Sequence, residues 1–323
     1  MTHRSNPSYE IKYKLTAETP ILSRQPEPWM QKEDGTLFIS GSSLMGAARN
    51  QYKQRATLAE TELRDSTERL LFDDVTKAPN IFFTDALCTN DPDIELHTSV
   101  SINAGTRLSD RAVFTRAAVP AGTEFVGRVT FTEKPNGVER CIALSAILDI
   151  PRWGTHATRG FGKWSVVILE RSSVVVFISY SWEDDKQHKK WVLDLALRLI
   201  NMGIDVLLDQ FAPIFDIQST QEEINEWMAQ SVNNSDKVIA VLTPTYRYKA
   251  ENGLGGVGFE YNRLRAENGK FSKNLERYVG IIRKGNCSTS LPSHLKNRPI
   301  FDMHNSLLFD KEFPALVQAL TLS

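Results

Sequence analysis

The feature that most constrains the fold is a regular alternation of apolar runs and amphipathic stretches in the second half of the chain. The run 174–179 (VVVFIS) is continuously apolar, as a strand covered on both faces requires. The next segment, 186–201, places Trp191, Leu195 and Leu199 at helical spacing. The same reasoning predicts strands at 204–208, 237–242, 278–283 and 299–301, and helices at 221–231, 258–267 and from about 312. Strands alternating with helices predict an α/β unit with a doubly wound parallel sheet, whose ligands bind at the carboxyl ends of the strands.

The first half of the chain is instead rich in strand-like segments and turns. Strands are predicted at 9–17, 37–39, 80–87, 112–119, 124–132 and 164–170. One helical stretch follows the turn at 40–43 and runs from Leu44 to about Leu71, with a break. This pattern is typical of an α+β unit with an antiparallel sheet. Only Arg171-Ser172-Ser173 separates the halves, so we predict two domains in contact, 1–171 and 172–323.

Composition excludes several classes of protein. The 323 residues carry 38 basic and 39 acidic side chains, so bulk charge does not indicate a nucleic-acid-binding polycation. Three scattered cysteines form no C-x-x-C pair, which argues against a disulfide framework and a structural zinc site, and no metal site is expected. We found no signal-peptide core and no apolar run of membrane-spanning length. These observations predict a cytoplasmic protein without membrane association.

The second half resembles a TIR domain of the bacterial, SEFIR-like branch, which has a flavodoxin-like fold. The resemblance rests on 174–211 (VVVFISYSWEDDKQHKKWVLDLALRLINMGIDVLLDQF), 237–246 (KVIAVLTPTY) and 253–264 (GLGGVGFEYNRL). Many TIR domains cleave NAD⁺ with a glutamate at the start of a helix, and the matching residue is Glu260. A carboxylate suits this chemistry because cleavage of the nicotinamide–ribose bond generates an oxocarbenium-like sugar, which a nearby anion stabilises. The alternative is that Glu260 only interacts with the helix dipole.

The resemblance also implies residues that contact NAD⁺. Tyr180, Ser181 and Trp182 form the loop after the first strand, Asp209 ends the second strand, and Phe259 precedes Glu260. Trp182 could equally be a packing residue and Asp209 a turn-former. The glycines at 253–258 follow a long loop and lack the strand–turn–helix context of a dinucleotide cofactor site. We therefore expect no cofactor, and NAD⁺ to be a substrate that is consumed.

The first half resembles the RAMP superfamily, the ferredoxin-like (RRM-like) subunits that form the RNA-binding backbone of CRISPR effector complexes. The resemblance rests on four segments: 38–50 (FISGSSLMGAARN), 71–86 (LFDDVTKAPNIFFTDA), 99–127 (SVSINAGTRLSDRAVFTRAAVPAGTEFVG) and 155–164 (THATRGFGKW). Hydroxyls and free N–H groups at a helix start can bind a phosphate, and basic side chains can follow an RNA backbone. The predicted RNA-binding residues are Ser42, Ser43, Arg49, Arg107, Arg111, Arg116, Arg159 and Lys163. The alternative is that Ser42 only caps its helix and the arginines are solvated.

Together the two resemblances predict an antiviral defence effector. Assembly of the RAMP half would activate an NAD⁺-hydrolysing TIR half. This assembly could take place on guide RNA, with other CRISPR-type subunits, or as a homo-oligomer or filament. Target RNA is a further predicted partner, and the product, linear or cyclic ADP-ribose, stays open. One alternative is a non-enzymatic TIR adaptor. Another is a RAMP-type endoribonuclease. The absence of an aspartate from the loop 22–33 argues against this alternative.

Overall fold

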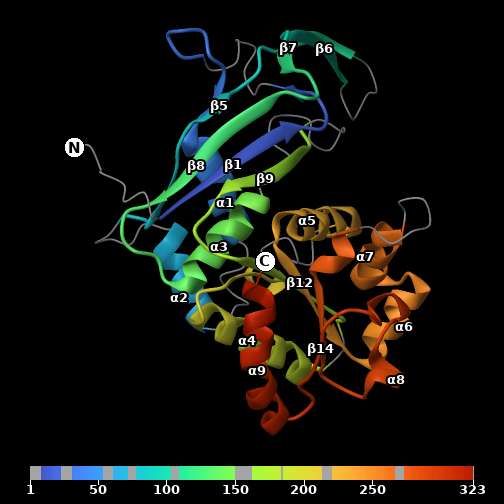
Figure 1. Cartoon of the computed structure of the whole chain (residues 1–323). Coiled ribbons are helices and arrows are strands. Elements are labelled where there is room, and N and C mark those ends of the chain that lie inside the picture. Colours follow the sequence, from blue (N-terminus) through green and yellow to red (C-terminus); the bar gives the residue numbers. More distant parts are fainter. Residues whose placement is uncertain are drawn as a thin grey trace. The chain divides into compact units, whose positions relative to one another are not determined.

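The computed structural model describes residues 9–22, 31–53, 61–71, 78–102, 109–149, 162–182, 185–212, 220–265 and 273–322. The chain divides into two compact units (Figure 1). Unit 1 comprises 1–53, 68–134 and 149–172, and unit 2 comprises 54–67, 135–148 and 173–323. None of the helices in the described ranges has the length and apolar character needed to cross a bilayer.

Unit 1 is built on an antiparallel sheet of order β3-β5-β8-β1-β9, in which β4 also pairs with β8. These strands are β1 Glu10–Ala17, β3 Phe38–Ile39, β4 Ile81–Phe83, β5 Ala86–Cys88, β8 Glu124–Phe131 and β9 Trp164–Glu170. In β1, every second side chain is buried, including Tyr13 and Leu15, so one face of the sheet forms the core. A smaller sheet contains β2 Ile21–Leu22, β6 Glu95–Ile102 and β7 Ser109–Val119. The antiparallel α+β prediction is confirmed.

Two differences from the predicted elements of unit 1 have local causes. The predicted helix is divided into α1 Gly41–Lys53 and α2 Thr61–Leu71. The predicted strand 80–87 is interrupted between β4 and β5, where Asp85 accepts a hydrogen bond from the first backbone N–H of α1, at Gly41 (3.0 Å). A Cβ on Gly41 would overlap the Phe83 carbonyl oxygen, so only glycine allows the helix to start this close to β4.

Unit 2 contains a five-stranded parallel sheet of order β11-β10-β12-β13-β14. Its strands are β10 Val175–Tyr180, β11 Asp205–Leu207, β12 Lys237–Leu242, β13 Tyr278–Ile282 and β14 Ile300–Asp302. Counted along the chain, this order is 2-1-3-4-5, the flavodoxin-like arrangement. Every residue of β10 is buried, as the continuous apolar run predicted. The predicted doubly wound α/β fold is confirmed.

Helices cover both faces of this sheet (Figure 1). They are α4 Lys186–Asn201, α5 Gln221–Asn234, α6 Pro244–Asn252, α7 Gly255–Arg265, α8 Cys287–Ser290 and α9 Ser306–Thr321. On one side α4 and α9 lie together, with the rings of Trp191 and Phe309 5.7 Å apart. Side-chain caps define the helix starts, for example Asp185 for α4 and Asn305 for α9. The cap at Asn305 explains why α9 begins at Ser306, earlier than predicted.

A helix that the sequence analysis did not predict, α3 Gly137–Leu148, packs within unit 2. Arg140 forms an ion pair with Asp205 of β11 (2.9 Å), and the Cys141 sulfur accepts a hydrogen bond from the Val206 N–H (3.1 Å). Nearly every residue of α3 is buried, so it has no amphipathic stripe that would mark it as a helix in the sequence.

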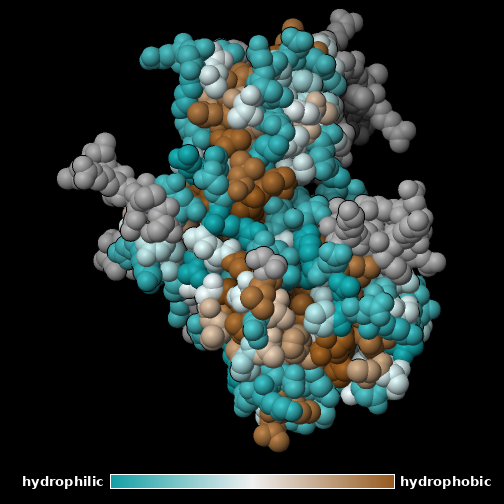
Figure 2. Space-filling view, in the orientation of Figure 1, coloured by the Kyte–Doolittle hydropathy of each residue, from teal (hydrophilic) through white to brown (hydrophobic). Residues whose placement is uncertain are grey.

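Hydrophilic residues predominate on the face of the molecule shown in Figure 2, and hydrophobic residues gather there only in limited areas. The apolar side chains of each unit are instead concentrated in its core, around Tyr13 and Phe125 in unit 1 and around β10 and β12 in unit 2. Each unit therefore contains its own hydrophobic core.

Candidate functional site

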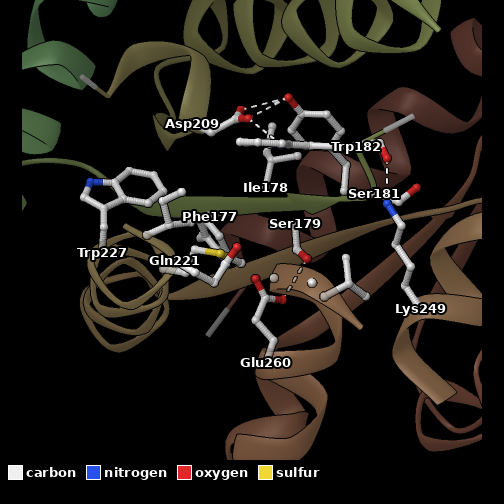
Figure 3. Close-up of a pocket in the computed structure, with 16 residues that line it drawn as sticks. Phe177, Ile178, Ser179, Ser181, Trp182, Asp209, Gln221, Trp227, Lys249 and Glu260 are labelled. Carbon is white, nitrogen blue, oxygen red and sulfur yellow. Dashed lines mark hydrogen bonds between the residues drawn. The ribbon is translucent and has the colours of Figure 1, made fainter. Parts of the chain in front are cut away.

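A cavity lies in unit 2 at the carboxyl end of β10. The strand β10 has β11 on one side and β12 on the other, so the order of the strands along the chain reverses at β10. Doubly wound sheets bind their ligands at the carboxyl ends of the strands at such a reversal. The cavity and the open solvent at its mouth together take up about 680 Å³. The lining includes Phe177, Ser179, Tyr180, Ser181, Trp182, Asp209, Trp227, Met228, Lys249, Gly256 and Glu260 (Figure 3).

Glu260 lies in the second turn of α7 and is only 5% exposed. Its Oε2 accepts a hydrogen bond from the Ser179 hydroxyl (2.7 Å; Figure 3), and its Oε1 has no hydrogen-bond partner among the described residues. Burial raises the pKa of Glu260 to about 8, and the Ser179 hydrogen bond only partly opposes this shift. Without a ligand, the side chain is therefore mainly a neutral acid at pH 7.

Glycines bring α7 close to its neighbours and so place Glu260 at the cavity. A Cβ on Gly256 would lie 2.6 Å from the Met228 methyl carbon of α5. A Cβ on Gly258 would overlap the backbone of Gly253, the left-handed residue that ends α6. The glycine-rich sequence before Glu260 thus serves close helix packing.

A second buried carboxylate, Asp209, organises the aromatic side of the cavity. It was predicted to end the second strand, but β11 ends at Leu207, and Asp209 instead begins the 3₁₀ turn Asp209–Phe211. It accepts hydrogen bonds from the Tyr180 hydroxyl (2.7 and 3.0 Å to its two oxygens) and from the Trp182 indole N–H (2.8 Å). Burial raises the pKa of Asp209, although these two donors favour its ionised form. Lys249 of α6 holds the same loop by donating to the Trp182 carbonyl (2.6 Å).

These groups define the kind of ligand that fits. Two carboxyl groups and several aromatic rings face one cavity, and Lys249, the basic side chain among the lining residues described, donates to the protein itself. Aromatic faces and carboxylates both attract cations. The arrangement therefore suits a flat ligand that carries or develops positive charge beside Glu260.

Comparison with known families identifies both halves of the chain. Residues 174–309 match the SEFIR domain, and residues 14–166 match the RAMP superfamily. The chain joins a RAMP domain to a SEFIR domain. No curated protein matches the sequence.

Solved structures of both kinds are similar to parts of the chain. A prokaryotic SEFIR domain shares 30% identity over 47% of this chain and 94% of that chain, with a TM-score of 0.38. A chain of the Type III-B Cmr-beta complex bound to cognate target RNA shares 17% identity over 49% of this chain and 61% of that one (TM-score 0.38). Cmr6 from Pyrococcus furiosus shares 14% identity over 48% of this chain and 97% of that one (TM-score 0.36).

Five of the six residues predicted for the NAD⁺ site line this cavity, namely Tyr180, Ser181, Trp182, Asp209 and Glu260. The sixth, Phe259, is half-buried and does not line it. The helix dipole acts most strongly in the first turn of a helix. Because α7 begins three residues earlier than predicted, Glu260 lies beyond that first turn.

The sequence analysis did not single out Ser179 and Lys249. Ser179 could have been found, because it lies two residues before Ser181 and so on the same face of β10. Nothing in the local sequence marks Lys249, since its role depends on how α6 packs against the Trp182 loop.

The predicted RNA-binding residues of the RAMP domain have structural partners wherever the structure describes these contacts. Ser42 and Ser43 are exposed at the start of α1, where Ser40 provides the hydroxyl that accepts from the Ser43 N–H (3.2 Å). The Arg49 Nε donates to the Leu71 carbonyl (2.7 Å), and Lys163 pairs with Glu18 (3.2 Å).

The remaining predicted basic residues are only partly described. Arg116 is half-buried in β7, opposite His97 of β6. Arg107, Arg159 and the side chain of Arg111 lie outside the described residues. An RNA-binding groove therefore stays a prediction.

Proposed function

We propose that the SEFIR domain hydrolyses NAD⁺, with Glu260 as the catalytic residue. The observation that carries this proposal is a buried carboxyl group with one unpartnered oxygen, Oε1, in a cavity rich in aromatic side chains. The nicotinamide ring of NAD⁺ is flat and cationic, and the ribose carbon attached to it becomes electron-deficient during cleavage. The same site can thus attract the substrate and stabilise the transition state.

The reaction is balanced without a cofactor. The bond between ribose C1′ and the nicotinamide nitrogen breaks, and its electron pair stays on the nitrogen, so nicotinamide leaves as a neutral molecule. Water adds to C1′ and gives up one proton, which yields ADP-ribose. Because the leaving group is already cationic, no general acid is required. Glu260 acts as the anion that faces the oxocarbenium-like sugar.

The raised pKa of Glu260 fits this role. An isolated buried carboxylate is unfavourable, which keeps the empty site neutral at pH 7. A cationic ring bound nearby favours the ionised form, so substrate binding itself generates the negative charge that the transition state needs. Trp182 is 52% exposed, and its indole N–H is fixed by Asp209, which suits it to contact the ring from the solvent side.

For the RAMP domain we propose a role in assembly on guide RNA with CRISPR-type subunits or further copies of this chain. The match of 14–166 to the RAMP superfamily supports this role. Assembly would then activate the SEFIR domain as an antiviral, NAD⁺-depleting effector, because a ligand that favours the assembled form shifts the population of competent sites.

The test measures nicotinamide released from NAD⁺ by the full chain, purified with and without its co-purifying RNA and imaged to establish assembly. Glu260→Gln preserves shape and removes the charge, so we expect release to fall about 10²–10³-fold. Asp194→Asn, which changes an exposed carboxylate of α4, serves as the matched control and should match the parent. Assembled protein that releases no nicotinamide, or a Glu260→Gln variant as active as the parent, would overturn the proposal and favour an adaptor.

A further inference from the structure

Two buried hydroxyl groups lie behind the carboxyl group of Glu260. The Ser179 Oγ, in β10, donates to Glu260 Oε2 at 2.7 Å and lies 3.3 Å from the Tyr246 hydroxyl of α6. Ser179 and Tyr246 are each 2% exposed. Tyr246 does not line the cavity, so the chain of hydroxyls leads from the protein interior to the carboxyl group.

The direction of these hydrogen bonds follows from proton counting. A serine hydroxyl has one proton, and beside the ionised Glu260, whose carboxylate can only accept, this proton is donated to Glu260. The contact between Ser179 and Tyr246 is therefore a hydrogen bond only if the Tyr246 hydroxyl donates to the Ser179 oxygen. Tyr246 and Ser179 then form a directed relay that ends on Oε2, while Oε1 has no partner among the described residues.

We propose that Ser179, supported by Tyr246, is a positioning residue that holds Glu260 by Oε2 and leaves Oε1 without a protein partner, as the acceptor available to a ligand. The catalytic meaning of this inference rests on the proposed function. The hydrogen bond to Glu260 can nevertheless be tested whether or not the protein hydrolyses NAD⁺. The hydrogen bond also favours the charged form of Glu260, against the effect of burial.

The other titratable groups around the cavity have different partners. Tyr180 donates to Asp209, Asp209 also accepts from Trp182, and Lys249 donates to the Trp182 carbonyl. Ser179 is thus the hydrogen-bond donor to Glu260 in the described part of the chain. Removing its hydroxyl should raise the pKa of Glu260, whereas a purely space-filling serine would leave this pKa unchanged.

The experiment titrates Glu260 directly in the full chain. Carboxyl ¹³C signals of protein labelled at glutamate are followed from pH 5 to 10, and Glu260 is assigned by the signal missing in Glu260→Gln. In Ser179→Ala the midpoint should rise by about one pH unit, the loss of one hydrogen bond to a charged group, which reduces the ionised fraction at pH 7 about tenfold. Tyr246→Phe should shift the midpoint in the same direction by less, and it serves if Ser179→Ala fails to fold.

Matched controls are Ser231→Ala, a buried serine of α5, and Tyr278→Phe, a buried tyrosine of β13, neither of which lines the cavity. Both should keep the parental midpoint. An unchanged midpoint in both Ser179→Ala and Tyr246→Phe would overturn the relay, whatever happens to activity. Absence of nicotinamide release from the parent would instead count against the proposed function, so the two failures are distinguishable.

Discussion

The burial of Glu260 predicts that folding stability falls as pH rises. In the folded protein its pKa is about 8, whereas the ordinary pKa of a glutamate side chain, which applies to the unfolded chain, is 4.5. Above pH 4.5 the unfolded chain loses a proton that the folded protein keeps, so ionisation favours unfolding. The stability associated with this group is fully present below pH 4.5 and is lost progressively as pH rises toward 8.

The magnitude follows from the two pKa values. Between acid pH and pH 7, ionisation of Glu260 lowers the free energy of unfolding by about 3 kcal/mol. Above pH 9 this loss approaches about 5 kcal/mol. Glu260→Gln removes the titration and keeps the shape of the side chain. The stability of this variant minus that of the parent should therefore increase by about 3 kcal/mol between pH 4 and pH 7.

Urea denaturation of the full chain from pH 4 to 9, followed by tryptophan fluorescence, measures this difference. The pH dependence carries the result, because a constant offset from the buried amide cancels between pH values. Asp194→Asn, an exposed carboxylate of α4, should follow the parent within about 0.5 kcal/mol across the range. A difference between Glu260→Gln and the parent that stays constant from pH 4 to 9 would refute a buried Glu260 with a raised pKa.

Three further predictions concern the same cavity. Binding of a non-hydrolysable NAD⁺ analogue that keeps the cationic nicotinamide ring should release close to one proton per site from the parent at pH 7 and almost none at pH 10, measured with an indicator dye in weak buffer, whereas Glu260→Gln should release less at pH 7. Gly258→Ala should destabilise the protein by about 1–3 kcal/mol in denaturant titration, because its Cβ meets the Gly253 backbone, while Gly46→Ala, with open space in α1, should be neutral or stabilising. Asp209→Ala should increase acrylamide quenching of tryptophan fluorescence, because it removes the acceptor of both the Trp182 indole N–H and the Tyr180 hydroxyl; unchanged quenching would contradict this assignment.

Much of the fold was predictable because local patterns in the sequence reflect burial. The strands β9 and β12 and the helix α4 have the predicted bounds. The buried strand β12 is apolar after Lys237 and the covering helix α4 is amphipathic, and both patterns can be recognised in the sequence. The helix α3 was missed because it is buried almost all round and shows neither pattern. The helix α6 was also missed. Its start is marked by the Thr243 cap and Pro244, but its hydrophobic stripe is weak.

The site could be predicted only as far as chain order determines position. Tyr180 to Trp182 follow the first strand of unit 2 and Asp209 follows the second, so the sheet topology brings them to one edge. The tasks of these residues depend on packing that the sequence does not encode locally. Both oxygens of Asp209 accept hydrogen bonds from Tyr180, and one also accepts from the indole of Trp182, which the sequence did not predict; contact of Asp209 with NAD⁺ stays a prediction. Ser179 lies in the same strand, yet its role depends on where Glu260 reaches it from α7.

The energetics of Glu260 argue for a ligand rather than a structural role. A helix needs no acid at a position that is 5% exposed, and an apolar residue there would avoid the pH-dependent loss of stability. The single hydrogen bond from Ser179 satisfies one carboxyl oxygen, and the other is buried without a hydrogen-bond partner among the described residues, in a side chain that lines a cavity bordered by aromatic rings. A cation in that cavity favours the ionised form that burial opposes. Under the proposed function, the energetic cost of burying Glu260 is offset when a cationic substrate binds; a purely adaptor function of the SEFIR domain leaves this cost unexplained.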